Sequence, residues 1–324
     1  MESLSYIPLL IAIGAIGLPV LVYAGLGMGE AILSILPVRT GRGLRPWVWL
    51  SLPILLVLLI LVYPVIVTLI TSLKGARGTE WLGGANYVWA FSGEMVDVVW
   101  NNVIWLIGFP LAVLVLALLS AVLFDKISYE PLAMTVVILP TAISFTAGSV
   151  IWTQMYSYQP AMMAQIGTFN AVLKLFGIAP VPWLIQPVVN NLALIFIAVW
   201  LQLGIATLIL SAAIKNIGTD MVEAARLDGA GEVRIFFSII LPNILPSILV
   251  VFTTMIIAAL KVFDIVYVMT NGNFGTDVIA NRLYYELFSV NDLGHASAIA
   301  VILLFCALPI AFINIFQFKA EAAR

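Results

Sequence analysis

Side chains that carry covalent or acid–base chemistry are scarce in this chain. It has one histidine, His295, and one cysteine, Cys306. A lone cysteine excludes an internal disulfide framework and a cysteine-based metal site. Neither the Gly-x-x-x-x-Gly-Lys pattern that cradles phosphates nor the Gly-x-Ser-x-Gly pattern of a serine nucleophile occurs. We therefore expect that the chain is not an enzyme and that it binds no metal or other cofactor of its own.

Charged side chains are concentrated in one segment. Of the 14 basic and 16 acidic residues, seven fall between Lys215 and Arg234. Asp220 can cap a helix N-terminus, and Glu223 follows three positions later, as in a capping box. The segment therefore predicts a short helix that begins near Asp220.

This short helix is expected to have a face of small residues and a sharp end. Ala224 and Ala225 are strong helix formers with little bulk, and Gly229 can adopt the left-handed conformation that ends a helix. A second amphipathic helix is expected over 232–240, ended by the prolines that follow it. Such a surface lets another protein approach closely, whereas an ordinary charged loop would only keep the helix ends hydrated. The residues alone leave both interpretations open.

The composition points to a membrane protein. Of the 324 residues, 63% are apolar and 9% are charged, whereas a soluble domain carries about 25% charged residues. The mean hydropathy of +1.14 agrees. A soluble enzyme, a disordered chain and a nucleic-acid binder, which needs a basic surface, are excluded. The formal net charge of −2 says little about partners.

Long uncharged stretches define the expected spans. A helix needs about 20 apolar residues to cross a bilayer, whereas barrel strands take about 10 residues each. The stretches here are longer than barrel strands and continuously apolar. We predict an all-α polytopic membrane protein with about seven transmembrane helices, placed near 5–27, 47–73, 101–124, 132–153, 191–212, 247–268 and 296–318. For the first of these, a cleaved or re-entrant segment is the alternative.

The region between Gln154 and Asn190, which carries a single charge at Lys174, is not expected to span. It contains prolines and Trp183. The spacing of Gly167, Asn170, Leu173 and Phe176 is typical of a short helix. This region is expected to lie at the interface and to be able to form part of a docking surface.

The basic residues set the expected orientation. An N-terminus outside and a C-terminus in the cytoplasm put nine Lys and Arg residues on the cytoplasmic side against four outside. The nine are Arg39, Arg42, Arg45, Lys126, Lys215, Arg226, Arg234, Lys319 and Arg324.

Two charges fall within the sixth expected span, at Lys261 and Asp264. A charge at the bilayer centre costs about 2.5–3.5 kcal/mol by insertion scales. On one continuous helix these residues would share a face and could pair. A structural ion pair, outward snorkelling of Lys261 and a polar lining for a transported solute are the open interpretations.

A family resemblance rests on the charged segment. Glu223-Ala224-Ala225, Asp228-Gly229-Ala230 and Leu241-Pro242 together resemble the EAA loop of permease subunits in bacterial ABC importers. The run 263–270 and the segment 260–282 resemble carbohydrate permeases related to the larger membrane subunit of the maltose transporter, most closely the alpha-glucoside branch. The resemblance covers about 47–318.

The resemblance implies a domain plan. Residues 46–324 would form a type I ABC importer permease core of six helices, with the cytoplasmic EAA loop at about 215–246. Residues 1–45 would add an extra N-terminal transmembrane helix and a basic cytoplasmic loop.

The resemblance also implies a function: half of the translocation path of an ATP-driven importer of an alpha-glucoside or other oligosaccharide. Glu223 would contact a separate ATPase, Ala224 and Ala225 would form the closely packed face, and Asp228 and Gly229 would belong to the same coupling element. The implied substrate-path residues are Trp200, Gln202, Lys261, Asp264 and Tyr267.

The implied partners are a second permease subunit, two ATP-binding cassette subunits that hold ATP and Mg, an extracytoplasmic sugar-binding protein and the lipid bilayer, with no nucleic acid. The implied location is the bacterial or archaeal cytoplasmic (inner) membrane. The alternatives are an ion-coupled secondary transporter and an ABC permease for a polyol or glycosylated osmolyte.

Overall fold

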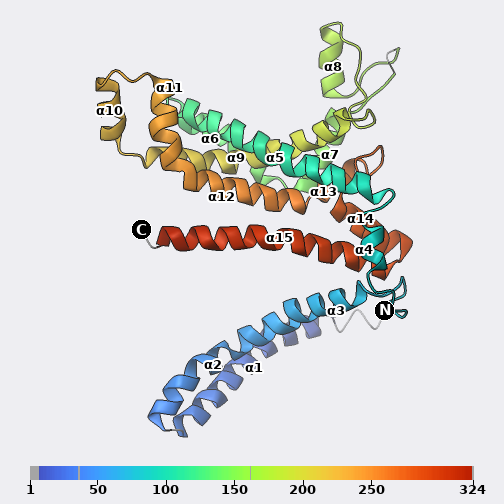
Figure 1. Cartoon of the computed structure of the whole chain (residues 1–324), viewed down its shortest axis with the longest axis vertical. Helices are drawn as coiled ribbons and strands as arrows, with labels where there is room; N and C mark the ends of the chain where they lie inside the picture. Colours follow the sequence, from blue (N-terminus) through green and yellow to red (C-terminus); the bar gives the residue numbers. More distant parts are fainter. Residues whose placement is uncertain (1–6, 36, 161, 323–324) are drawn as a thin grey trace. The chain divides into compact units, whose positions relative to one another are not determined.

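The computed structural model describes residues 7–35, 37–160 and 162–322, and the regular elements within them are helical. Contacts divide the chain into two compact units, Met1–Ile70 and Thr71–Arg324. Figure 1 shows the helices of both units, and each unit is considered separately. The expectation of an all-α protein is confirmed for the described residues.

The first unit is a helical hairpin. It contains α1 (Ile7–Ile35), α2 (Val38–Val57), the π-helical turn η2 (Leu58–Val62) and α3 (Tyr63–Thr71). Near the turn, the Glu30 carboxylate accepts hydrogen bonds from Arg45 Nη2 at 3.0 Å and from Trp49 Nε1 at 2.7 Å. The start of the first predicted helix at residue 5 lies outside the described residues.

The basic segment before residue 46 was expected to be a loop. This expectation is wrong, because α2 already begins at Val38. Pro46 and Pro53 lie inside this helix. Proline inside a helix is tolerated in a membrane because neighbouring helices and local π adjustments satisfy the freed carbonyl groups. Here η2 follows within a few residues of Pro53.

The second unit is built on four long helices. These are α5 (Met95–Phe124), α9 (Val189–Lys215), α12 (Leu241–Leu260) and α15 (Leu293–Ala322). Side chains from the first three form most of the buried core, which includes Trp105, Phe109, Leu194 and Val251. α15 joins a smaller cluster with Met95 through its buried Ile299.

Several helices are long and apolar enough to cross a membrane. Within the described residues there are five, at Gly43–Thr71, Met95–Phe124, Val189–Lys215, Glu232–Leu260 and Leu293–Phe312. A bent pair of helices brings the number to six. The first predicted span lies in α1, and most of its side chains are outside the described residues.

The fourth predicted span is broken. α6 (Glu130–Ile138) and the 3-10 turn η3 (Leu139–Ala142) are followed by α7 (Phe145–Met155), with a bend of 101°. Pro140 lies in the turn. The Ser144 hydroxyl caps the N-terminus of α7 by accepting a hydrogen bond from the Ala147 amide at 3.1 Å. The prediction of one continuous helix over 132–153 is therefore wrong, because the chain ends one helix and caps a new one.

The sixth predicted span is also interrupted. α12 ends at Leu260, and α13 (Asp264–Met269) begins after a three-residue break. Phe263 leaves helical geometry with φ −141° and ψ −60°, and its ring stacks on Tyr267 at 5.1 Å. The predicted continuous helix over 247–268 is wrong because this aromatic packing redirects the chain.

Short elements occupy the two ends of the second unit. α10 (Thr219–Leu227) and α11 (Glu232–Ile235) lie at one end of α5, α9 and α12 (Figure 1). The other end carries α4 (Ala85–Trp89), α14 (Ile279–Tyr285) and the π turn η5 (Glu286–Val290). α8 (Thr168–Leu175) extends beyond the bundle near α7. Helix α8 confirms the short helix predicted around Asn170.

Candidate coupling and substrate sites

The charged segment forms the short helix that the sequence predicts, but it begins differently. α10 has Gly218 at its N-cap, and no side chain caps it. Asp220 already lies in the first helical turn, so the predicted capping box with Glu223 is wrong. Glu223, Ala224 and Asp228 are exposed, as a docking helix requires.

The end of α10 is as predicted. Gly229 has φ +81°, its N–H donates to the Arg226 carbonyl at 3.0 Å, and the Ala230 N–H donates to the Ala225 carbonyl at 3.0 Å. These two bonds form a Schellman motif, which favours glycine at the left-handed position. A side chain at Gly229 would meet no atom within 4 Å, so the requirement for glycine comes from the backbone conformation.

The second helix of the loop does not end at the prolines. α11 continues through the π turn η4 (Phe236–Ile240) into α12, which starts at Leu241. Pro242 and Pro246 lack the N–H that a helix interior needs, and the π turn just before Pro242 adjusts the backbone. The stop predicted at these prolines is wrong, and α11 is therefore continuous with a helix that is long and apolar enough to cross a membrane.

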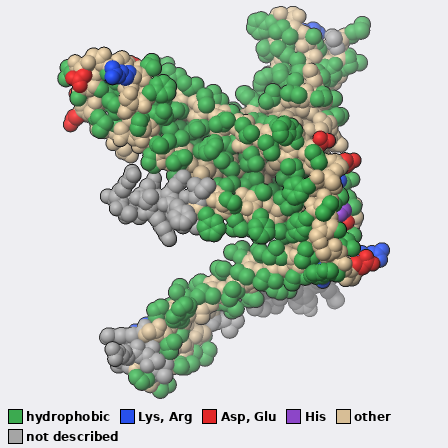
Figure 2. Space-filling model, viewed as in Figure 1, with side chains coloured by type: hydrophobic (Ala, Val, Ile, Leu, Met, Phe, Trp, Pro, Cys, Tyr) green, Lys and Arg blue, Asp and Glu red, His purple; other side chains and the backbone are tan. Residues whose placement is uncertain are grey.

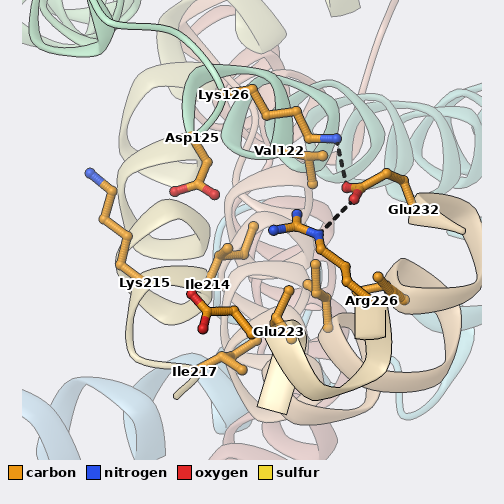
Figure 3. Close-up of a pocket in the computed structure, with 12 residues that line it drawn as sticks. Val122, Asp125, Lys126, Ile214, Lys215, Ile217, Glu223, Arg226 and Glu232 are labelled. Carbon is orange, nitrogen blue, oxygen red and sulfur yellow. Dashed lines mark hydrogen bonds and ion pairs between the residues drawn. The ribbon is translucent and has the colours of Figure 1, made fainter. Parts of the chain in front are cut away.

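A cavity of about 290 Å³ lies between α10 and the ends of α5 and α9 (Figure 3). Apolar walls come from Val122, Ile214 and Ile217, and charged ones include Asp125, Lys126, Lys215, Glu223, Arg226 and Glu232. Residues from α5, α9, α10 and α11, or from the turns next to them, therefore line one cavity.

One carboxylate joins these elements. Glu232 Oε2 accepts from Lys126 Nζ at 3.0 Å, and Glu232 Oε1 accepts from Arg226 Nε at 2.9 Å (Figure 3). Lys215 pairs with Glu130 beside them. Arg226 lies on α10 and Lys126 directly after α5, so Glu232 ties the short helix to the bundle.

A second cavity, also about 290 Å³, contains the two charges predicted within the sixth span. Lys261 caps the end of α12 and Asp264 begins α13, so the predicted shared helix face is wrong. Asp264 Oδ1 accepts a hydrogen bond from Thr146 Oγ1 of α7 at 3.0 Å. Both charged residues line this cavity, although the structure gives no ion pair between these two described residues.

Aromatic residues make up half of the remaining lining of this cavity. They are Trp105, Phe109, Phe145 and Phe263. Trp105 is fully buried, and its indole Nε1 has no hydrogen-bond partner among the described residues. An unpaired buried donor is costly, and a hydroxyl group that entered the cavity could accept its hydrogen bond.

The other predicted path residues lie apart from this cavity. Trp200 on α9 packs edge-on against Trp152 at 5.5 Å, and Gln202 is half-buried on the same helix. Tyr267 stacks on Phe263 and contacts Tyr284 at 5.0 Å. Tyr267 touches the cavity wall through Phe263 but does not line it, so two of the five predicted path residues, Lys261 and Asp264, line this cavity.

Sequence reasoning missed an asparagine cluster at the opposite end from α10. Asn101 Nδ2 donates to the carbonyls of Gly275 and Asp277 at 2.8 and 2.9 Å. Asn102 Oδ1 accepts the Ile279 amide at 2.6 Å, and Asn190 donates to the Phe274 carbonyl at 2.7 Å. The paired asparagines in the second turn of α5 and the first turn of α9 were the available signal. They hold the loop between α13 and α14.

A buried acid, Glu286, lies at the same end of the second unit as the asparagine cluster. Glu286 is 3% exposed and pairs with Arg282 Nε at 2.8 Å. His295 Nδ1 lies 3.5 Å from the same carboxylate, and its ring stacks on Trp89 at 3.6 Å between centroids. This contact fastens α4 to the start of α15.

Comparison with known proteins agrees with this architecture. Residues 128–321 match the model of the binding-protein-dependent transport system inner membrane component family. The osmoprotective compounds uptake permease protein of Synechocystis sp. is 46% identical over 81% of this chain and 94% of its own length. The alpha-glucoside transport system permease protein of Rhizobium meliloti is 40% identical over 86% of this chain and 83% of its own.

A solved structure has the same fold. It is a chain of a bacterial ABC transporter involved in the import of the acidic polysaccharide alginate, with a TM-score of 0.72 and 23% identity. The match covers 87% of this chain and 99% of that one. The predicted permease fold is therefore confirmed.

Proposed function

Because the chain belongs to the family of inner membrane components of binding-protein-dependent transport systems, we propose that it forms half of the translocation path of an ATP-driven carbohydrate importer. The observation that carries this proposal is the arrangement of the second unit. An exposed, small-faced helix, α10, lies at one end of the bundle, and a cavity with polar and aromatic walls lies further along α12.

We propose that α10 transmits the movement of a partner ATPase to the membrane helices. Glu223 would supply a charged contact, Ala224 and Ala225 a closely packed face, and Asp228 with Gly229 the turn. The continuous run from α11 into α12 supports this role, because a displacement of α10 would be passed directly to a helix that lines the cavity. ATP and Mg would be bound by the partner.

The proposed assembly contains a second permease subunit, two ATP-binding cassette subunits and an extracytoplasmic sugar-binding protein. The end with α10 would face the cytoplasm, with the N-terminus of the chain outside and the C-terminus inside. The nine-to-four distribution of basic residues supports this orientation. Residues 1–45 would contribute the additional N-terminal helix to a core formed by 46–324.

Two substrate classes compete. An alpha-glucoside or other oligosaccharide fits the relative from Rhizobium meliloti, and a glycosylated osmolyte or polyol fits the relative from Synechocystis sp.. Both offer hydroxyl groups to Trp105, Lys261 and Asp264, and flat apolar faces to the aromatic walls of the cavity. Binding of a sugar and polyol panel to the cognate binding protein would separate the two classes.

The experiment that tests the proposal is uptake by vesicles that contain the assembled transporter. Vanadate should stop uptake, and Glu223→Lys should abolish uptake and weaken ATPase association while membrane insertion stays normal. Glu80→Lys, an exposed carboxylate outside the coupling loop, is the matched control and should leave uptake unchanged. Normal ATP-driven uptake by Glu223→Lys would contradict the coupling role.

The ion-coupled alternative has a different signature. Uptake by an ion-coupled transporter would stop when an uncoupler dissipates the ion gradient while ATP remains present. Midplane carboxylates are typical of that class, and Asp264 at the start of α13 is bound to Thr146 instead of standing alone in a span. Uptake that withstands the uncoupler but not vanadate supports the ATP-driven importer.

A further inference from the structure

The segment between Met155 and Val189 has the composition of a membrane surface, although it does not span. Lys174 is its one charged residue, whereas a water-exposed segment of this length would carry about eight at the usual 25%. It lies at the end of α7, away from α10 (Figure 1). Figure 2 shows hydrophobic side chains over most of the visible protrusion that carries α8.

One face of α8 is firmly fixed to the bundle. Asn170 is fully buried. Its Nδ2 donates to the carbonyls of Ser157 and Val181, and its Oδ1 accepts from the Val181 amide and from Trp183 Nε1 at 2.9 and 3.2 Å. Phe169, the preceding residue, stacks on Trp152 of α7 at 5.5 Å. The segment therefore has a defined tertiary structure, held by these contacts, and a defined outer surface.

The outer face of α8 is apolar and has no covering partner among the described residues. Leu175 is 84% exposed and Phe176 is 76% exposed. Other large apolar side chains of the segment are also exposed, which are Met162, Met163, Ile166, Val172 and Ile178. A large exposed apolar patch marks a protein or membrane contact.

The inner face of α8 is linked through buried Trp152 to the outer surface of a spanning helix. Phe196 of α9 is exposed and packs edge-on against Trp152 at 5.3 Å, and Trp152 in turn contacts Phe169. The axis of α8 runs across the direction of α5 and α12 (Figure 1), which is the direction of a helix that lies in a membrane surface.

We propose that α8 and its flanking turns are a membrane-interface anchor that inserts into the leaflet on the side opposite α10. Leu175, Phe176 and Ile178 would lie about 5–10 Å into the boundary between headgroups and acyl chains. Lys174 would extend its ammonium group to the headgroups while its methylenes stay in the apolar layer.

The lipid surface is favoured over a soluble partner for a physical reason. A binding protein that docks and leaves would return this apolar face to water in every cycle, whereas the bilayer covers it continuously. The near absence of charge around the face also removes the electrostatic steering that transient protein association uses. The anchor would hold α7, and with it the Thr146–Asp264 contact, at a constant depth.

The test places a fluorescent label on the face in the complete transporter, reconstituted in nanodiscs. In a Cys306→Ser background, Leu175→Cys and Phe176→Cys are labelled separately with an environment-sensitive dye. Glu80→Cys, on an exposed loop of the same unit, is the matched control. Lipids carrying a quencher high on the acyl chain should reduce the fluorescence of both α8 labels at least about twofold more than that of the control.

Three results would overturn the proposal. The α8 labels could be quenched by soluble iodide as strongly as the control, which would mean a hydrated face. Protection from iodide only when the binding protein is added would identify a docking surface for that protein. Protection that appears only with the second permease, in the absence of lipid quenching, would identify a subunit interface.

Discussion

Glu232 and Lys126 are 106 positions apart in the sequence, and their side chains meet at 3.0 Å. The same carboxylate holds Arg226 of α10 at 2.9 Å. Both ion pairs are about half exposed, where an isolated pair is worth about 0–1 kcal/mol. The two pairs matter for geometry, because the Glu232 carboxylate holds α10 next to the end of α5.

Removing this acid should loosen the transmission of ATPase movement. Glu232→Gln keeps the shape of the side chain and loses the charge. We expect the number of ATP molecules hydrolysed per solute transported to rise about twofold, and a double-mutant cycle with Lys126→Met should show non-additive effects on stability. Glu94→Gln, at the exposed Arg282 pair of the other end, is the control. If the effects of Glu232→Gln and Lys126→Met simply add, the contact between these two side chains contributes nothing.

The left-handed turn at Gly229 allows a matched pair of glycine substitutions. Gly229→Ala should cost about 1–2 kcal/mol, because alanine disfavours a φ of +81°. Gly231→Ala should cost much less, since Gly231 has φ −72° and also has open space around it. The readout is the affinity of the purified permease for the ATPase, with Gly229→Asn expected to recover part of the loss. Equal effects at both glycines would show that the turn conformation is unimportant.

The unpartnered indole of Trp105 offers a test of the substrate cavity. Trp105→Phe keeps an aromatic ring and removes the donor, so the KM of uptake should rise about fivefold if a substrate hydroxyl accepts that hydrogen bond. Trp152→Phe is the control, because Trp152 also has a buried, unpartnered Nε1 among the described residues but does not line the cavity. A KM change in the control alone, or in neither variant, would remove Trp105 from the path.

The loop held by the asparagine cluster should be more stable in acid. Burial raises the pKa of the Asp277 carboxyl above its usual 3.8, and the hydrogen bond from Asn281 only partly opposes this. The folded state therefore binds the proton more tightly than the unfolded state, and this contribution is complete below pH 3.8 and is lost as pH rises through the raised pKa.

Asp277→Asn should remove this dependence. The thermal midpoint of the variant minus that of the unchanged protein should increase as pH rises from about 4 to about 7. Asn281 donates to Asp277 at 2.7 Å, and an asparagine oxygen at position 277 can still accept that bond. A constant difference across this range would mean that Asp277 does not titrate in the folded protein.

Local sequence rules were sufficient for some elements of the coupling loop. Ala224 and Ala225 lie in a helix, and Gly229 adopts the predicted left-handed conformation, because these outcomes depend on neighbours within five residues. The helix start and the proline stop were wrong. Asp220 fell inside the helix, and the π turn before Pro242 allowed the chain to continue; both depend on how the whole loop meets the bundle.

The amino-acid sequence by itself determined that this is a helical membrane protein and where its charged loop with the short helix α10 lies, because charges are too costly in lipid to be placed freely. Only the tertiary structure decided what surrounds Lys261 and Asp264. The chain breaks between them, and the partner of Asp264 is Thr146, 118 positions away. The asparagine cluster and the Glu232 contact have the same origin, since their partners are brought together by helix packing and no local pattern specifies them.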